Sequence, residues 1–178
     1  MNEINSRDHV KHDPFLTWEL YAIIGRIMFL WSSTEKDLRR EISRLHPAVE
    51  KKKTHQISRL IKLWKALLLE SAVEGPAHEE IIEAAYLRLN KALDVRNRLT
   101  HGLTGLEGSQ EGCKETAYLY TELNGKKQKI SLTELEETAD SLNKVYSYMT
   151  TVYFWTQKPI QPYEEIAYNE FRNRIVIR

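Results

Sequence analysis

Residues 76–102 read PAHEEIIEAAYLRLNKALDVRNRLTHG, and this stretch decides the fold class. Apolar side chains return every three or four positions, which is the period of an α-helix with one buried face. Gly75-Pro76 separates the stretch from what precedes it, and Gly102 can take the left-handed conformation that ends many helices. The spacing predicts a helix over about 76–100. Its inward residues are Ile81, Ile82, Ala85, Leu89, Ala92, Leu93 and Leu99.

Two helices are predicted before this one. Asp13-Pro14 is a favourable helix start, and His46-Pro47 ends the helix that follows. Its apolar stripe is Leu20, Ile24, Ile27, Trp31, Leu38, Ile42 and Leu45. A second helix is predicted over about 51–71. Its inward residues are Ile57, Leu60, Ile61, Trp64, Leu67 and Leu68.

A hairpin and a fourth helix are predicted after the glycine-punctuated loop 102–112. TAYLYTELNGKKQKISL, residues 116–132, alternates polar and apolar residues before Asn124-Gly125, a strong signal for a two-residue β-turn. Ser131 and Glu134 have the spacing of a capping box, which opens a helix. The stripe of that helix is Leu135, Ala139, Leu142, Val145, Met149 and Val152.

These elements predict an all-α protein, a four- to five-helix bundle with a small β-hairpin inserted between the third and fourth long helices. We expect residues 1–13 to be a flexible leader, 14–157 to be the helical bundle, and 158–178 to be a tail. The tail would form a short helix or an arm laid on a partner. The fourth helix ends in many aromatic residues, which suggests that this end also faces a second copy of the chain. They are Tyr146, Tyr148, Tyr153, Phe154 and Trp155.

Composition narrows the classes of protein that remain. A chain of 178 residues with 42% hydrophobic residues suits one domain. A lone cysteine, Cys113, allows no internal disulfide, and the N-terminal stretch has no signal-peptide run; we therefore expect a cytoplasmic protein. The longest apolar run is shorter than a membrane span and contains Arg26, so no membrane partner is expected.

Charge and ligand patterns give little direct indication of a bound group. A formal net charge of +1 offers no global attraction to nucleic acid, and a local patch such as KKQK, residues 126–129, is more typical of solvated surface. His9 and His12 lie in the leader without further ligands, and no zinc spacing, phosphate loop or paired-carboxylate motif is present. We expect no metal site and no cofactor.

The end of the third helix combines an arginine, an asparagine and a histidine. At about 100° per residue, Asn97 and His101 lie within roughly 40° of each other on the helix, whereas Arg96 lies roughly 140° from His101. Either Arg96 reaches around the helix, or His101 has already left it. The alternative that this stretch is only a helix end stays open. A histidine and Arg98 both suit the negative end of a helix dipole, and Gly102 is an ordinary cap.

The chemistry of these side chains suits RNA cleavage without a metal. A guanidinium binds phosphate oxygens through paired hydrogen bonds, and an imidazole both takes and gives protons near neutral pH. Cleavage by the 2′-hydroxyl needs a base and an acid, yet one chain offers one such histidine. A two-fold dimer that brings both copies of His101 into one cleft would supply them.

Glu35 is a further candidate, because it falls on the apolar stripe of the first helix between Trp31 and Leu38. In one interpretation Thr34 takes the inward position and Glu35 lies at the edge of the stripe. In the other Glu35 has a functional or pairing role, for which Arg96 across the first and third helices is the candidate partner.

The chain resembles the HEPN family over roughly residues 15–157. The resemblance rests on Arg96, Asn97 and His101 in RNRLTHG, on FLWSSTEKDLRREI in the first helix and on SLTELEE at the start of the late helix. It implies a helical bundle that dimerises through the motif face and, in many members, a metal-independent endoribonuclease that acts as a toxin or defence effector. Toxin members regulated by nucleotidylation carry a tyrosine at the position of Thr100, which puts that regulation in doubt here.

From the resemblance we expect Arg96 and His101 to be the catalytic pair and Asn97 their polar support. Arg98, Thr100 and Glu35 are candidate substrate-binding residues. RNA, a second copy of the chain, and an antitoxin or defence-system partner are the expected partners. The alternatives are a catalytically inactive HEPN-like module that binds RNA, a nucleotide or a protein, and an interaction protein that uses the aromatic end of the fourth helix and the tail.

Overall fold

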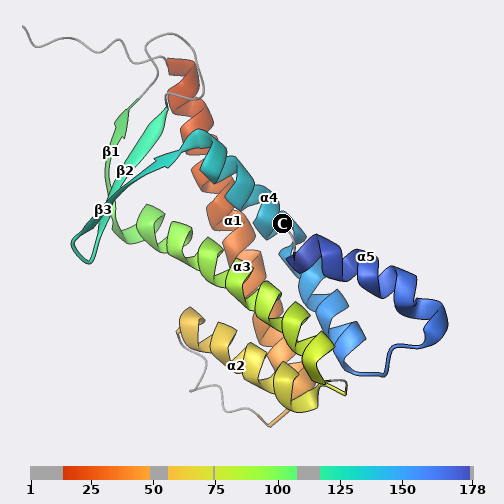
Figure 1. Cartoon of the computed structure of the whole chain (residues 1–178). Coiled ribbons are helices and arrows are strands. Elements are labelled where there is room, and N and C mark those ends of the chain that lie inside the picture. The colour runs from red at the N-terminus through yellow and green to blue at the C-terminus, as the bar shows by residue number, and fades with distance from the viewer. Residues whose placement is uncertain (1–13, 49–55, 74, 108–116, 177–178) are drawn as a thin grey trace, which may run out of the picture.

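The computed structural model describes residues 14–48, 56–73, 75–107 and 117–176, which form mostly helix with one small three-stranded antiparallel sheet (Figure 1). The prediction of a mainly helical protein is confirmed. The helices are α1 Pro14–Leu45, α2 Ile57–Ser71, α3 Gly75–His101, α4 Leu132–Thr156 and α5 Glu165–Val176, with a 3₁₀ turn at Pro162–Glu164. The strands are β1 Leu103–Glu107, β2 Tyr118–Leu123 and β3 Lys126–Ser131.

The helix boundaries follow the local signals where the structure describes them. α1 ends at Leu45, directly before His46-Pro47, as predicted. At the start of α4, the Ser131 hydroxyl accepts a hydrogen bond from the Glu134 backbone N–H at 3.1 Å, and the Glu134 carboxylate accepts one from the Ser131 N–H at 2.8 Å. This is the predicted capping box. α2 begins at Ile57, and the earlier part of its predicted range, residues 51–55, lies outside the described residues.

The core lies where the apolar stripes of the long helices meet. All inward residues predicted for α3 and α4 are buried, and Trp31 of α1 and Trp64 of α2 are the largest fully buried side chains. On α1 the buried face includes Ile23 rather than Ile24, and Thr34 fills the gap in the stripe. The Thr34 hydroxyl donates to the Leu30 carbonyl at 2.9 Å, so its polarity is satisfied inside the helix. The interpretation that places Thr34 inward is thus confirmed.

The sheet between α3 and α4 has one strand more than the predicted hairpin. β2 and β3 join through Asn124 and Gly125, whose φ angles of 53° and 73° are those of the expected turn. β1, which we expected to be loop, pairs antiparallel with β2. The sequence of β1 gave no strand signal, because the strand is short and contains Gly105. It forms through its pairing with β2 rather than through its own β-propensity.

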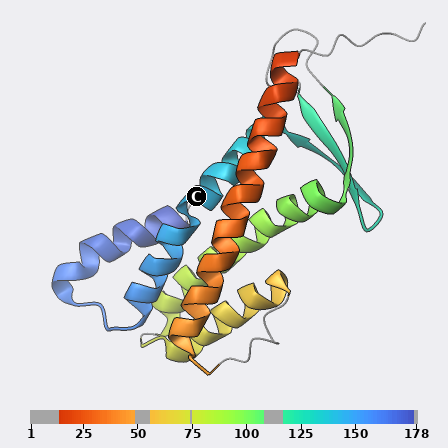
Figure 2. The same ribbon diagram turned by 180° about the vertical axis from the view of Figure 1, so that it is seen from behind.

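The tail forms the short helix α5, which packs against α3 (Figures 1 and 2). The Tyr168 hydroxyl donates to the Ala77 carbonyl at 2.8 Å, and Arg172 pairs with Glu80 at 2.6 Å. Trp155, near the end of α4, is buried and packs edge-on against Tyr168 at 5.5 Å between ring centroids. α5 therefore covers part of the aromatic end of α4, while Phe154 remains half exposed.

No helix in the described ranges combines the length and apolar character that crossing a bilayer requires.

Candidate active site at the end of α3

The motif occupies the last turn of an intact helix. The Thr100 hydroxyl donates to the Arg96 carbonyl at 2.9 Å, and the backbone N–H of Gly102 donates to the Arg98 carbonyl at 2.9 Å. The backbone bond continues the helical pattern through His101, which is the last residue of α3. His101 therefore has not left the helix, and Arg96 must reach around it to meet the face that carries His101.

A hydrogen bond to Asn97 positions the Arg96 guanidinium, which must reach around the helix toward the face of His101. Nη1 of Arg96 donates to the side-chain oxygen of Asn97 at 3.0 Å, and both side chains are half-buried. Nε of Arg96 is buried and has no hydrogen-bond partner among the described residues. Because Asn97 lies roughly 40° from His101 on an ideal helix, the bond draws the guanidinium toward the histidine face.

His101 and Thr100 are exposed at the end of the helix. The hydroxyl of Thr100 is used within the helix, since it also lies 3.3 Å from the Asn97 carbonyl. For the imidazole of His101, the described part of the chain supplies no hydrogen-bond partner. Both of its nitrogens are thus open to an incoming ligand.

Arg98 faces the sheet instead. Its side chain is buried, Nε donates to Asp94 at 2.9 Å, and Nη1 lies 3.4 Å from the Lys126 carbonyl. The guanidinium therefore joins the end of α3 to the start of β3. A contact between Arg98 and a substrate stays a prediction.

Gly102 permits a close approach of β2 and is not the left-handed helix cap that the sequence suggests. Among the described residues only Asn124 and Gly125 have positive φ, so the prediction of a left-handed cap at Gly102 is wrong. A Cβ at this position would lie 2.9 Å from the Glu122 carbonyl oxygen and 3.1 Å from that of Arg98. The Glu122 N–H donates to the Gly102 carbonyl at 2.6 Å. Glycine is needed because β2 passes too close to the helix end for any side chain.

The hairpin brings basic side chains next to the motif. Lys126 and Lys127 directly follow the turn that Arg98 and Gly102 anchor, and Lys127 is paired only loosely with Glu122, at 4.0 Å. Lys126 forms no ion pair within the described ranges. The sequence signal was KKQK after Asn124-Gly125, but its place near the end of α3 follows from the long-range contacts of the hairpin with Arg98 and Gly102.

Farther along the hairpin, Lys129 lies over the rings of Tyr118 and Tyr120, with its ammonium nitrogen 5.2 and 4.8 Å from their centroids. Tyr120 donates a hydrogen bond to Glu107, and Lys129 lies 3.4 Å from the same carboxylate. The hydrogen bond from Tyr120 and the charge of Lys129 lower the pKa of Glu107. The pKa of Lys129 is raised, chiefly by its hydrogen bond with Tyr120 and also by Glu107.

Glu35 does not pair with Arg96. Its carboxylate lies 2.6 Å from Nη2 of Arg39, one turn farther along α1. The expected pair across α1 and α3 is therefore wrong, because a partner at the (i, i+4) position is closer at hand. A contact between Glu35 and a substrate remains an untested prediction.

The chain also buries a carboxylate that the sequence analysis missed. Glu41 of α1 is only 3% exposed, and its Oε2 lies 3.8 Å from Nη1 of Arg44 without a hydrogen bond. The signal was its spacing, because Glu41 follows Ile27 and Thr34 at intervals of seven on the same face of the helix. Within the described part of the chain, no hydrogen bond or ion pair connects Glu41 to the motif, so it does not enter the candidate site.

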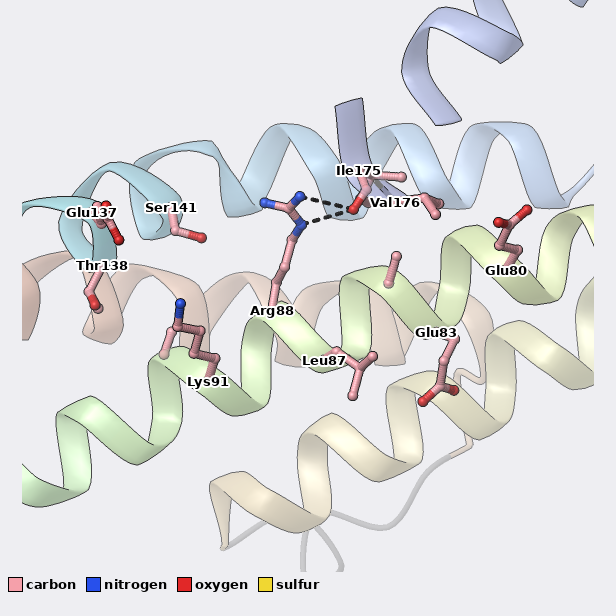
Figure 3. A pocket seen from close by; sticks show the side chains of 12 residues that line it. Glu80, Glu83, Leu87, Arg88, Lys91, Glu137, Thr138, Ser141, Ile175 and Val176 are labelled. Atoms are coloured by element: carbon pink, nitrogen blue, oxygen red, sulfur yellow. Dashed lines mark hydrogen bonds between the residues drawn. The ribbon is translucent and has the colours of Figure 1, made fainter. Parts of the chain in front are cut away.

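A groove lies apart from the motif, between α3, α4 and the end of α5 (Figure 3). It has a volume of about 930 Å³, and Figure 3 shows Arg88 reaching across it to the Ile175 carbonyl, to which Nε and Nη2 donate at 3.1 and 2.9 Å. Arg88 therefore caps the last turn of α5. The end of the groove that holds Glu137 is also lined by Lys91, Thr138 and Ser141.

In the described ranges, His, Cys, Asp and Glu side chains form no group of three or more that could hold a metal ion. His9, His12 and Cys113 lie outside those ranges. No family model, curated protein or solved structure matches the chain. The geometry at the end of α3 and the sequence motif are therefore what a functional assignment rests on.

Proposed function

We propose that the chain is a metal-independent endoribonuclease of the HEPN type, in which the long helices form the family's bundle and α3 carries the catalytic residues. The observation that supports this best is the hydrogen bond from Arg96 to Asn97 at 3.0 Å on an intact helix end. It turns a phosphate-binding group toward the face of an exposed histidine. A histidine that merely ended a helix would not need such an arrangement.

The proposed reaction is transesterification by the RNA itself. A base takes the proton of a 2′-hydroxyl, the oxygen attacks the adjacent phosphorus, and an acid protonates the departing 5′-oxygen. The products carry a 2′,3′-cyclic phosphate and a 5′-hydroxyl. His101 acts as the acid or base, and Arg96 binds the phosphate whose charge develops in the transition state.

Two copies of the chain complete the site in this proposal. One copy of His101 serves as base and the other as acid, with two copies of Arg96 on the phosphate. General acid–base catalysis is typically worth about 10²- to 10⁴-fold in rate, so losing either role should be readily measured. In the setting that the HEPN resemblance implies, the enzyme is a cytoplasmic toxin or defence effector held in check by a partner protein.

A panel of single variants tests the proposal. Wild type, Arg96→Ala and His101→Ala are incubated with structured and unstructured RNA in excess EDTA. We expect wild type alone to cleave, while circular dichroism shows that both variants remain folded. His46→Ala is the matched control, because His46 is also exposed and lies directly after the last residue of α1, at a helix end without the motif. Cleavage that is equally lost in His46→Ala, or equally retained in His101→Ala, contradicts the assignment.

A second candidate is an inactive module that binds RNA, a nucleotide or a protein. It is favoured by the groove between α3, α4 and α5, which the motif residues do not line. In this case wild type binds RNA or a nucleotide but never cleaves RNA, and groove variants such as Lys91→Glu weaken binding while His101→Ala does not.

A further inference from the structure

The groove between α3, α4 and the end of α5 has the size of a small-molecule site. Its volume of about 930 Å³ lies in the range of pockets that enclose drug-sized ligands, about 300–1,000 Å³. α3 forms one long side of the groove, where lining residues recur every three or four positions from Glu80 to Lys91. Residues of α4 lie across from it, and the last residues of α5 complete the lining (Figure 3).

Part of this lining is apolar and accessible. Leu87 is 58% exposed, and Ala84, one turn earlier on the same face of α3, is half-buried. Val176 of α5 also lines the groove and is half-buried. The seven residues from Ala84 to Lys91 correspond to about 10 Å along α3, at about 1.5 Å per residue. The groove can therefore hold an alkyl chain of about this length.

Three carboxylates stand among the described lining residues, and two of them are already neutralised. Glu80 pairs with Arg172 of α5 at 2.6 Å, and Glu83 pairs with Lys65 of α2. The third carboxylate, Glu137 of α4, forms no ion pair with the residues that the structure describes. Glu137 is therefore the negative charge that remains in the groove.

The two cations of the groove, Arg88 and Lys91, have no carboxylate partner within the described ranges. Nε and Nη2 of Arg88 donate to backbone carbonyls of α5, which carry no formal charge. Lys91 forms neither an ion pair nor a hydrogen bond with the described residues. The two cations lie three positions apart on α3, where like charges repel each other. Set against Glu137 alone, they leave the groove with one positive charge in excess.

We propose that this groove binds a small monocarboxylate with an apolar body, such as a medium-chain fatty acid. Figure 3 shows Arg88, Lys91 and Ser141 directed into the same part of the groove. The carboxylate accepts hydrogen bonds from the guanidinium, the ammonium and the hydroxyl, and charged groups make such bonds strong. The alkyl chain lies along Leu87 and covers apolar surface that is otherwise in water.

The charge and composition of the groove favour this class over its rivals. A single carboxylate matches the one positive charge in excess. A nucleotide is a poorer ligand, because the second charge of its phosphate meets Glu137 and because no described lining residue is aromatic, so a base has no ring on which to stack. An uncharged alkyl chain is also poorer, since it leaves Arg88 and Lys91 without a counter-charge.

Isothermal titration calorimetry of the full chain with sodium octanoate tests the inference. We expect a Kd of about 1 mM or tighter, as ligand efficiency allows for a molecule of this size. Acetate keeps the charge without the chain, 1-octanol keeps the chain without the charge, and AMP represents a nucleotide. Each should bind at least about 10-fold more weakly. No octanoate binding at about 10 mM, or an equal affinity for octanol or AMP, overturns the inference.

Two charge variants give changes of opposite sign. Lys91→Ala should weaken octanoate binding about 5-fold, because an exposed ion pair contributes little more than that. Glu137→Gln should tighten it, since it removes a negative charge and keeps the shape of the side chain. Lys144→Ala is the control, because Lys144 is exposed on α4 outside the lining. Unchanged affinity in Lys91→Ala, or weaker binding by Glu137→Gln, contradicts the proposed contact.

A second pair of variants locates the alkyl chain. Leu87→Glu should weaken octanoate binding at least about 10-fold, because it places a negative charge on the apolar wall. Leu69→Glu is the control, since Leu69 is 39% exposed on α2 outside the lining. If Leu87→Glu binds as wild type does, octanoate lies elsewhere and the inference fails. Arg96 and His101 do not line the groove, so this inference and the proposed function can fail separately.

Discussion

Asn97 makes the most specific contact at the candidate site, because its side-chain oxygen accepts a hydrogen bond from Arg96. We predict that Asn97→Ala lowers kcat by about 10- to 100-fold, since the guanidinium loses the group that directs it. Asn97→Asp keeps the acceptor oxygen and should recover much of the loss. Single-turnover cleavage by folded variants measures both effects, and an Asn97→Asp enzyme as slow as Asn97→Ala would rule out this positioning role.

Gly102 provides a prediction about stability. Gly102→Ala places a methyl group 2.9 Å from the Glu122 carbonyl oxygen, so β2 and the helix end must move apart. We expect a loss of about 1–3 kcal/mol in the free energy of unfolding, measured by urea denaturation. Gly75→Ala, where the added methyl meets nothing within 4 Å, is the control and should not destabilise the fold. Equal effects of the two substitutions would contradict the close approach.

Single-residue roles were predictable only where they depend on local chemistry. The sequence predicted one helix that carries Arg96, Asn97 and His101, and the three residues lie on α3. The close approach of β2 to Gly102 could not be predicted, because β2 begins at Tyr118, far along the chain from Gly102. The same holds for Arg98, whose burial depends on the hairpin beside it.

The β2–β3 hairpin carries Lys126 and Lys127, and its backbone contacts the end of α3. We predict that replacing Lys126 and Lys127 by alanine weakens RNA binding and reduces the slope of log K against log salt by about 0.7 for each phosphate that the protein no longer neutralises. The measurement uses the His101→Ala background so that RNA stays intact. Lys62→Ala with Lys144→Ala is the control pair, because both lysines are exposed on other helices. If this pair lowers the slope as much, RNA binding is not localised to the hairpin.

Glu107, the last residue of β1, allows a test by pH. Its folded-state pKa lies below the ordinary value of 4.5, chiefly because Tyr120 donates a hydrogen bond to it. Its contribution to stability is therefore present above the unfolded-state pKa and lost as pH falls through the lowered folded-state value. We expect Tyr120→Phe to raise the pKa of Glu107, as measured by carboxyl ¹³C NMR titration. An unchanged pKa would show that Tyr120 does not act on this carboxylate.

Among the elements, those with strong local signals were predictable. The capping box of α4, the Asn124-Gly125 turn and the stop of α1 before Pro47 each depend on neighbouring residues. β1 and α5 depend on contacts made far along the chain, with β2 and α3 respectively. For β1 the sequence predicted a loop, and for α5 it left a short helix or an arm open, because isolated short segments have weak structural preferences.

For the whole molecule, we predict that activity depends on assembly. If two copies of His101 share one cleft, the cleavage rate per protomer should fall as the enzyme is diluted below its dimer dissociation constant. Initial rates over a dilution series measure this. A rate per protomer that is independent of concentration, with the chain monomeric, would contradict a shared cleft.

The most direct test of the central claim is the chemistry of the RNA ends. A defined oligoribonucleotide is cleaved in EDTA by wild type and by His101→Ala, and the same oligonucleotide with a 2′-O-methyl group at the mapped cleavage site serves as substrate control. The account predicts 2′,3′-cyclic phosphate and 5′-hydroxyl ends from wild type alone, and no cleavage at the methylated position. Cleavage of the methylated substrate, or equal cleavage by His101→Ala, would show that the end of α3 is not a ribonuclease site.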